Sequence, residues 1–153
     1  MSRLFSRYAP LVAWLLFISY ASSDSFNAGN TSRIIGPLVL WLFPNTSAET
    51  LLTIHMIVRK TAHFTEYAIL AFLAARAFRS SPRPALATRW FLASLTLVVT
   101  YALLDEYHQS FVPSRTGSIY DSLIDISGGL TALLLIRRRH NADRRSKFDS
   151  GVV

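Results

Sequence analysis

The chain has 153 residues, of which 51% are apolar and 16% are charged, whereas soluble domains of this size carry about 25% charged residues. This composition excludes an intrinsically disordered chain and argues against an ordinary water-soluble domain. Cysteine is absent, which excludes disulfides, thiolate metal sites and a cysteine nucleophile. The net charge is +7, and the partner that this charge indicates depends on where the basic residues lie.

Four apolar stretches, taken in chain order, predict membrane-spanning helices. They cover residues 8–23, 51–75, 90–104 and 119–136. A spanning helix needs about 20 mostly apolar residues, so each stretch spans only if its polar end is included. None of the stretches alternates in the way that strands of a membrane barrel do. We therefore expect an all-α, polytopic membrane bundle of about four transmembrane helices.

Shorter segments connect these helices. Residues 34–43 are apolar but too few to span, which predicts an interfacial or re-entrant segment between the first and second helices. Residues 76–89 and residues 107–118 each contain proline with polar neighbours, so we expect both to be loops.

The two ends of the chain differ in character. Residues 1–137 are expected to form a single transmembrane domain, and residues 138–153 a basic, disordered cytoplasmic tail. The first apolar stretch also has the features of a signal peptide, with Arg7 before it and the small residues Ser19 and Ala21 at its end. Cleavage of this stretch is the alternative to a retained first helix.

The basic residues give an orientation. Twelve of the sixteen Lys and Arg residues lie in the N-terminus, in residues 76–89 and in residues 137–153, which share one side of a four-helix arrangement. The positive-inside rule therefore places both termini in the cytoplasm. Anionic lipid headgroups account for this positive charge, so membrane lipids are the expected partners and nucleic acid is not.

The ionisable residues of the last three helices fall at one depth. They lie about 15–24 Å from the basic end of a hydrocarbon core that is about 30 Å thick. Because a charge that faces lipid costs about 2.5–3.5 kcal/mol, we expect these side chains to converge on a pocket open to the outer face. The candidate catalytic residues are His63, Glu66, Asp105, Glu106, His108, Asp121 and Asp125. The candidate substrate-binding residues are Arg59, Lys60, Tyr67, Gln109 and Arg115.

Negative charge exceeds positive charge in this predicted pocket. Protonated histidine, a neutral carboxylic acid or a bound cation would balance it, and the first two are the groups that general acid–base catalysis uses. The spacings His63-x-x-Glu66 and Asp105-x-x-His108 each place two metal ligands on one helix face, so a metal stays open, while no organic cofactor is expected. The alternative is a structural ion-pair network that only clamps the helices.

Two segments resemble the VanZ-like family of bacterial membrane proteins. They are RKTAHFTEYAILAF, residues 59–72, and DEYHQSFVPSRTGSIYDSLIDISGG, residues 105–129, within a similarity that covers about residues 55–137. Ser114 stands where the family usually has glycine. The resemblance implies a multi-pass inner-membrane protein, and the founding member is associated with low-level resistance to the glycopeptide teicoplanin.

Two functions follow for the chain. The first is a cell-envelope protein whose outward pocket binds or modifies a lipid-linked or peptidoglycan-related molecule, with the cations holding an anionic group and His63 moving protons. Whether any reaction is catalysed stays open. The second is a proton- or ion-coupled transport protein in which the carboxylates form a relay. The inner halves of the last three helices contain no ionisable residue, which favours a one-sided site.

Overall fold

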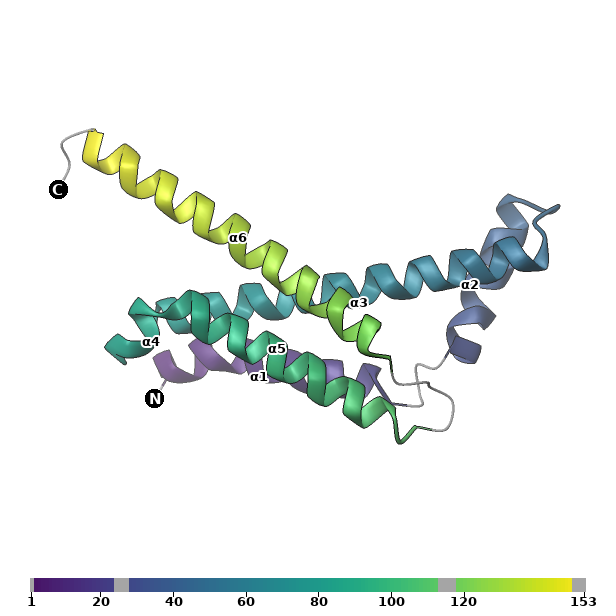
Figure 1. The fold of residues 1–153 in the computed structure, drawn as a ribbon, viewed down its shortest axis with the longest axis horizontal. Coiled ribbons are helices and arrows are strands. Elements are labelled where there is room, and N and C mark those ends of the chain that lie inside the picture. Colours follow the sequence, from purple (N-terminus) through teal and green to yellow (C-terminus); the bar gives the residue numbers. More distant parts are fainter. Residues whose placement is uncertain (1, 24–27, 113–117, 150–153) are drawn as a thin grey trace.

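The computed structural model describes residues 2–23, 28–112 and 118–149. These residues form six helices and no strand (Figure 1), which confirms the all-α prediction. The helices are α1 (Ser2–Ala21), α2 (Ala28–Leu42), α3 (Ala48–Arg79), α4 (Pro84–Thr88), α5 (Trp90–Gln109) and α6 (Ile119–Asp149). The four longest, α1, α3, α5 and α6, contain nearly all of the four apolar stretches of the sequence.

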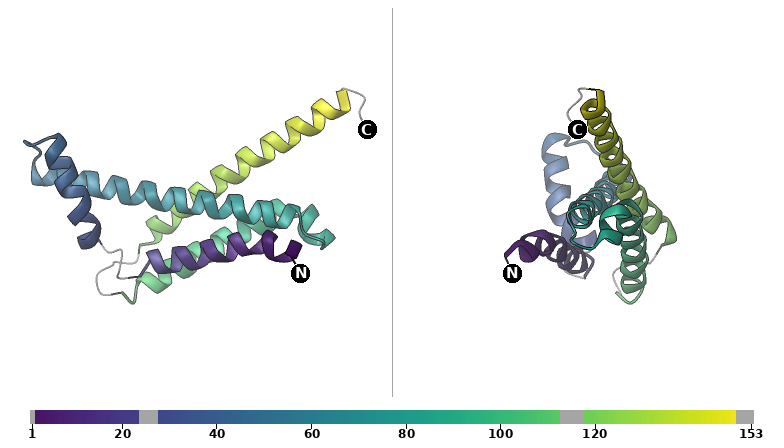
Figure 2. Two further views of the ribbon diagram at one scale, coloured as in Figure 1. Left: turned by 180° about the vertical axis from the view of Figure 1, so that it is seen from behind. Right: turned by 90° about the vertical axis from the view of Figure 1, so that its left-hand side faces the viewer.

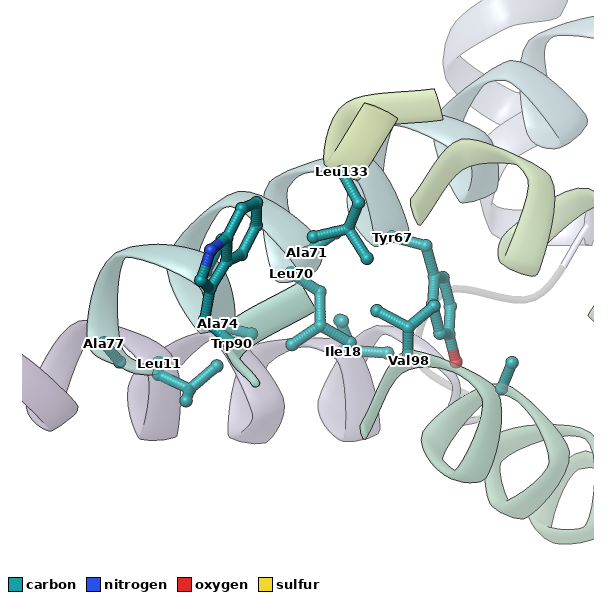
Figure 3. Packing of buried hydrophobic residues seen from close by; sticks show 12 residues of the cluster. Leu11, Ile18, Tyr67, Leu70, Ala71, Ala74, Ala77, Trp90, Val98 and Leu133 are labelled. Carbon is teal, nitrogen blue, oxygen red and sulfur yellow. The ribbon is translucent and has the colours of Figure 1, made fainter. Parts of the chain in front are cut away.

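Helix α3 is the centre of the bundle, because α1, α5 and α6 all pack against it (Figure 2). Its buried face is a stripe at helical spacing that includes Tyr67, Leu70, Ala71 and Ala74 (Figure 3). Several of these residues are small, and small residues let helix backbones approach closely. Close packing of this kind, rather than hydrophobic collapse, holds helices together inside a membrane.

Helix α6 crosses α3 (Figure 1). Their backbones approach closely at Gly128. A Cβ atom at Gly128 would overlap the carbonyl oxygen of Phe64 and lie 2.9 Å from its carbonyl carbon. At the next position, Gly129, a Cβ atom would lie 2.6 Å from a methyl group of Val98. Only a residue without a side chain therefore fits where the two backbones meet.

Two helices in the described part of the chain are long and apolar enough to cross a membrane. They contain the windows Leu4–Ala21 and Ile119–Ser146. The expectation of four transmembrane helices is therefore not confirmed. Helix α3 carries Arg59, Lys60 and other ionisable residues within its apolar stretch, and α5 ends in a polar segment, which lowers the hydropathy of both.

The connecting segments are more helical than expected. Residues 34–43 lie almost wholly within α2, and residues 76–89 contain the end of α3 and the short helix α4, which begins at Pro84. Proline suits the first position of a helix because its missing N–H would have no helical partner there. Helix α5 continues to Gln109, and residues 113–117 lie outside the described residues.

The prediction of a disordered tail is wrong for most of its length. Helix α6 continues without a break to Asp149, so residues 138–149 are helical and extend away from the bundle (Figure 1). These residues contain no proline or glycine, and arginine, alanine and lysine have high helix propensity. Low hydropathy is a poor marker of a helix end when the polar residues themselves favour helix.

Candidate functional site

Three helices bring four ionisable side chains together near one end of the bundle. His63 and Tyr67 lie one turn apart on α3, Asp105 lies on α5 and Asp125 lies on α6. Tyr67, Asp105 and Asp125 are buried, with Asp125 only 1% exposed, and His63 is half-buried. We call these four residues the inner cluster.

The polar atoms of the inner cluster are close to one another. His63 Nδ1 and Asp125 Oδ1 are 3.3 Å apart, and each of His63, Asp105 and Asp125 offers a ligand atom within 4.8 Å of the others. The close approach of α6 to α3 at Gly128 explains the first distance, because Asp125 precedes Gly128 by one turn and His63 precedes Phe64. The packing of the two backbones thus sets the geometry of the site.

Several of these atoms lack the partners that buried polar groups normally have. His63 Nδ1, the Tyr67 hydroxyl and Asp125 Oδ1 make no hydrogen bond to any described residue. Leaving a buried polar group unsatisfied costs about 1–3 kcal/mol. Two ionised carboxylates within 4.8 Å also repel by at least about 3 kcal/mol at an effective dielectric constant of about 20.

Asp105 is held from two sides. Its Oδ2 accepts hydrogen bonds from Gln109 Nε2 at 2.9 Å and from Ser22 Oγ at 2.8 Å. Gln109 lies one turn further along α5, and Ser22 directly follows α1. Both donors are buried, so they fix the orientation of the carboxylate.

An ion pair lies beside the inner cluster, nearer the surface. Lys60 Nζ is 2.8 Å from Asp121 Oδ1, and the two side chains are 49% and 25% exposed. Lys60, His63, Asp121 and Ile124 line a cavity of about 10 Å³, which is the size of one water molecule at most. Beside the inner cluster the described residues therefore leave a small cavity, and the open pocket expected from the sequence is not confirmed.

Two other candidate residues of α5, Glu106 and His108, lie outside the inner cluster. The backbone N–H of Ser118 donates to the Glu106 carboxylate, which ties the end of α5 to the residue before α6. His108 is exposed, although it lies only three residues from Asp105. Glu106 thus has a structural contact, and His108 stands apart from the inner cluster.

The remaining candidates are Arg59, Glu66 and Arg115. Arg59 and Glu66 are half-buried on α3 and carry opposite charges. Arg115 falls within residues 113–117 and lies outside the described residues.

Ser22 is the site residue that the sequence did not indicate. It directly follows α1, which makes two further hydrogen bonds to the bundle. Trp14 Nε1 donates to the Glu66 carbonyl at 2.9 Å. The Leu15 carbonyl accepts from the Tyr101 hydroxyl at 2.6 Å. Helix α1 is therefore packed against α3 and α5. The only sequence signal for Ser22 was its place at the polar outer end of the first apolar stretch, level with Asp105.

A basic hollow lies at the opposite end of the bundle. It has a volume of about 700 Å³, and Arg76, Arg79 and Arg144 contribute positive charge to its lining. Arg79 lies over the Trp90 ring at 5.4 Å, and its Nη2 is 3.0 Å from His140 Nδ1. None of the described residues that line this hollow is a carboxylate.

The side chains of the inner cluster can support two kinds of chemistry. A histidine beside two carboxylates can exchange protons with a bound molecule. The same imidazole nitrogen and carboxylate oxygens are ligands for a divalent metal ion. His63, Asp105 and Asp125 are the described residues that could hold such an ion.

Comparison with protein families identifies the chain. The model of the VanZ/LLP1 family matches residues 5–140, which include the whole inner cluster and most of α1. No curated protein and no solved structure gives a significant match. The match covers most of the chain and confirms the resemblance of its two motifs. The chain is a member of the VanZ/LLP1 family.

Proposed function

We propose that this VanZ/LLP1 protein is a multi-pass protein of the bacterial inner membrane whose inner cluster binds the anionic head of a lipid-linked component of the cell envelope. The observation that carries the proposal is a buried, incompletely satisfied cluster of His63, Asp105 and Asp125 beneath an exposed lysine at one end of an apolar bundle. Such a cluster in a membrane protein is by default a candidate for function.

The surface of the bundle supports a membrane location. Large apolar side chains are exposed along the helices, among them Leu16 on α1, Phe72 on α3 and Leu104 on α5. Exposed apolar surface of this extent is rare on soluble monomers and is typical of proteins that face lipid. Helix α3, with 32 residues, is about 48 Å long and exceeds the hydrocarbon core of about 30 Å.

The two ends of the bundle support the orientation. The end with Arg76, Arg79 and Arg144 is basic, whereas the end with Asp105, Asp121 and Asp125 is acidic. The positive-inside rule assigns the basic end to the cytoplasm, so the inner cluster faces the outer leaflet. A lipid-linked molecule in that leaflet would reach the cluster past Lys60.

The packing argues against the transport alternative. Between the inner cluster and the basic end, the core consists of residues such as Leu70, Ala74, Val98 and Leu133 (Figure 3). A proton relay needs ionisable side chains along its path. The described core in this region offers none, so a one-sided binding site accounts better for the arrangement.

We expect the purified protein to bind a polyprenyl phosphate and not phosphatidylcholine. Lys60→Gln should weaken this binding about tenfold, because the substitution removes the cation beside the approach to His63. The measurement is native mass spectrometry or a thermal-shift titration in detergent. Arg83→Gln, at an exposed position of the basic end, is the matched control and should leave the affinity unchanged. Equal binding of both lipids by the unaltered protein would refute the proposed ligand.

The absence of cysteine allows a direct test of the orientation. Single cysteines at two exposed positions, Asn45 before α3 and Ser80 directly after it, report on the two ends of that helix. We expect a membrane-impermeant maleimide to label Asn45→Cys in spheroplasts, and Ser80→Cys only after permeabilisation. Labelling of both from the outside would show that α3 does not span, and the reverse pattern would invert the orientation.

A further inference from the structure

We infer that the inner cluster is a divalent-metal site in which His63, Asp105 and Asp125 are the ligands. Their ligand atoms lie within 4.8 Å of one another and come from α3, α5 and α6. Ligands of a tetrahedral zinc ion are about 3.4 Å apart, a separation that small side-chain rotations would reach. The role of the ion rests on the proposed function, but its binding does not.

The unsatisfied atoms point to a ligand. His63 Nδ1 and Asp125 Oδ1 face each other as an ion-pair contact of 3.3 Å that lacks hydrogen-bond geometry, and neither atom has another hydrogen-bond partner among the described residues. The Asp125 residue is 1% exposed, so bulk water does not serve as its partner. A cation between the two atoms would accept a lone pair from each and satisfy both.

The charges of the site point to a cation. When both are ionised, Asp105 and Asp125 contribute two negative charges, and His63 contributes at most one positive charge. Lys60 is engaged with Asp121 at 2.8 Å, and Arg59 and Glu66 on α3 carry opposite charges. The inner cluster therefore retains negative charge when its own residues are counted. A divalent ion would balance this charge and would allow an anionic headgroup to approach.

The surroundings of Asp105 are those of an oriented ligand. Gln109 and Ser22 both donate to Oδ2 of this carboxylate, at 2.9 Å and 2.8 Å. Hydrogen bonds from outside the ligand set commonly orient metal-binding side chains, and their loss weakens metal binding about 10–100-fold. Ser22 and Gln109 are buried residues that would have this positioning role.

The donor set indicates the class of metal. One imidazole nitrogen and two carboxylate oxygens suit Zn²⁺ or Mn²⁺ better than Mg²⁺ or Ca²⁺, which prefer oxygen ligands alone. The buried Tyr67 hydroxyl, which has no hydrogen-bond partner among the described residues, lies close enough to Asp105 and Asp125 to be affected by their charges. It is available to hold a molecule bound to the ion.

The test is a zinc titration of the full chain. The protein is purified in detergent with a histidine-free tag, treated with EDTA, separated from the chelator and titrated with Zn²⁺ by calorimetry. We expect a single Zn²⁺ per chain, with at least about 50-fold weaker binding for Asp125→Asn and for His63→Ala. Substitution with Co²⁺ should give visible absorption bands of nitrogen and oxygen coordination.

Matched variants separate the site from adventitious binding. His108→Ala removes a potential ligand outside the inner cluster and should change the affinity by no more than about twofold. Asp105→Asn, which preserves shape, should weaken binding as Asp125→Asn does. No binding by the unaltered chain, or equal binding by Asp125→Asn and the unaltered chain, would overturn the inference. If polyprenyl phosphate still bound in that case, the proposed function would stand without the metal.

Discussion

Gly128→Ala is expected to destabilise the protein by about 3 kcal/mol, the upper end of what overpacking usually costs. The new methyl group would overlap the carbonyl oxygen of Phe64, which belongs to the backbone of α3 and cannot rotate away. Helix α6 would have to move off α3, and His63 would separate from Asp125 as a result. We expect the melting temperature in detergent to fall by about 10 °C and metal binding to weaken with it.

Two other glycines are controls for this substitution. At Gly129 the added methyl group would meet the Val98 side chain, which can change its rotamer, so a smaller loss is expected. At Gly36 in α2, nothing lies within 4 Å of the added atom, and Gly36→Ala should leave the melting temperature unchanged or slightly raised. Equal effects at Gly128 and Gly36 would contradict the close crossing of α6 and α3.

The order and type of the helices could be predicted from the sequence, but their ends could not. The four apolar stretches lie almost wholly within helices, because long apolar segments without alternation favour helix. Helix α3 begins three residues before its stretch and ends four residues after it, and α6 extends to Asp149. Polar residues with high helix propensity continue a helix beyond its apolar part, and hydropathy does not register them.

The meeting of His63, Asp105 and Asp125 followed from their shared depth and from the cost of facing lipid. Depth alone does not give the direction in which a side chain points around its helix. His108 and Glu106 share the same region of α5, yet one is exposed and the other contacts the backbone before α6. Rotation about each helix axis depends on packing with neighbours, which one sequence does not reveal.

The partners of Asp105 and Lys60 could not be predicted at all. Ser22 lies 83 residues away from Asp105 in the chain, and no local pattern links the two. Beside the inner cluster, Lys60 of α3 pairs with Asp121 of α6. Both features arise only when the helices are assembled.

Asp125→Asn is expected to abolish the function of the inner cluster while making the metal-free protein more stable. The amide keeps the shape of the carboxylate but removes one of two buried charges within 4.8 Å of each other. Relief of that repulsion, offset in part by the lost attraction to His63, should stabilise the protein by about 1–2 kcal/mol. Affinity for Zn²⁺ should fall at least about 50-fold, and affinity for polyprenyl phosphate should fall with it. Sites that store such repulsion commonly exchange stability for function.

A structural clamp predicts the opposite. If the contact of His63 with Asp125 served only to hold α3 against α6, then removal of the charge would weaken it and lower the stability. The clamp and the functional site therefore predict opposite signs for the change in stability that Asp125→Asn causes. Asp121→Asn, which breaks the exposed pair with Lys60, is the control and should change stability by less than about 1 kcal/mol.

The most direct measurement is the melting temperature of Asp125→Asn beside that of the unaltered protein, first in EDTA and then in Zn²⁺. We predict that the variant melts about 3–6 °C higher in EDTA. We also predict that Zn²⁺ raises the melting temperature of the unaltered protein alone, because an ion that binds only the folded state stabilises it. A variant that melts below the unaltered protein in EDTA would contradict the account and would show that the inner cluster is a clamp.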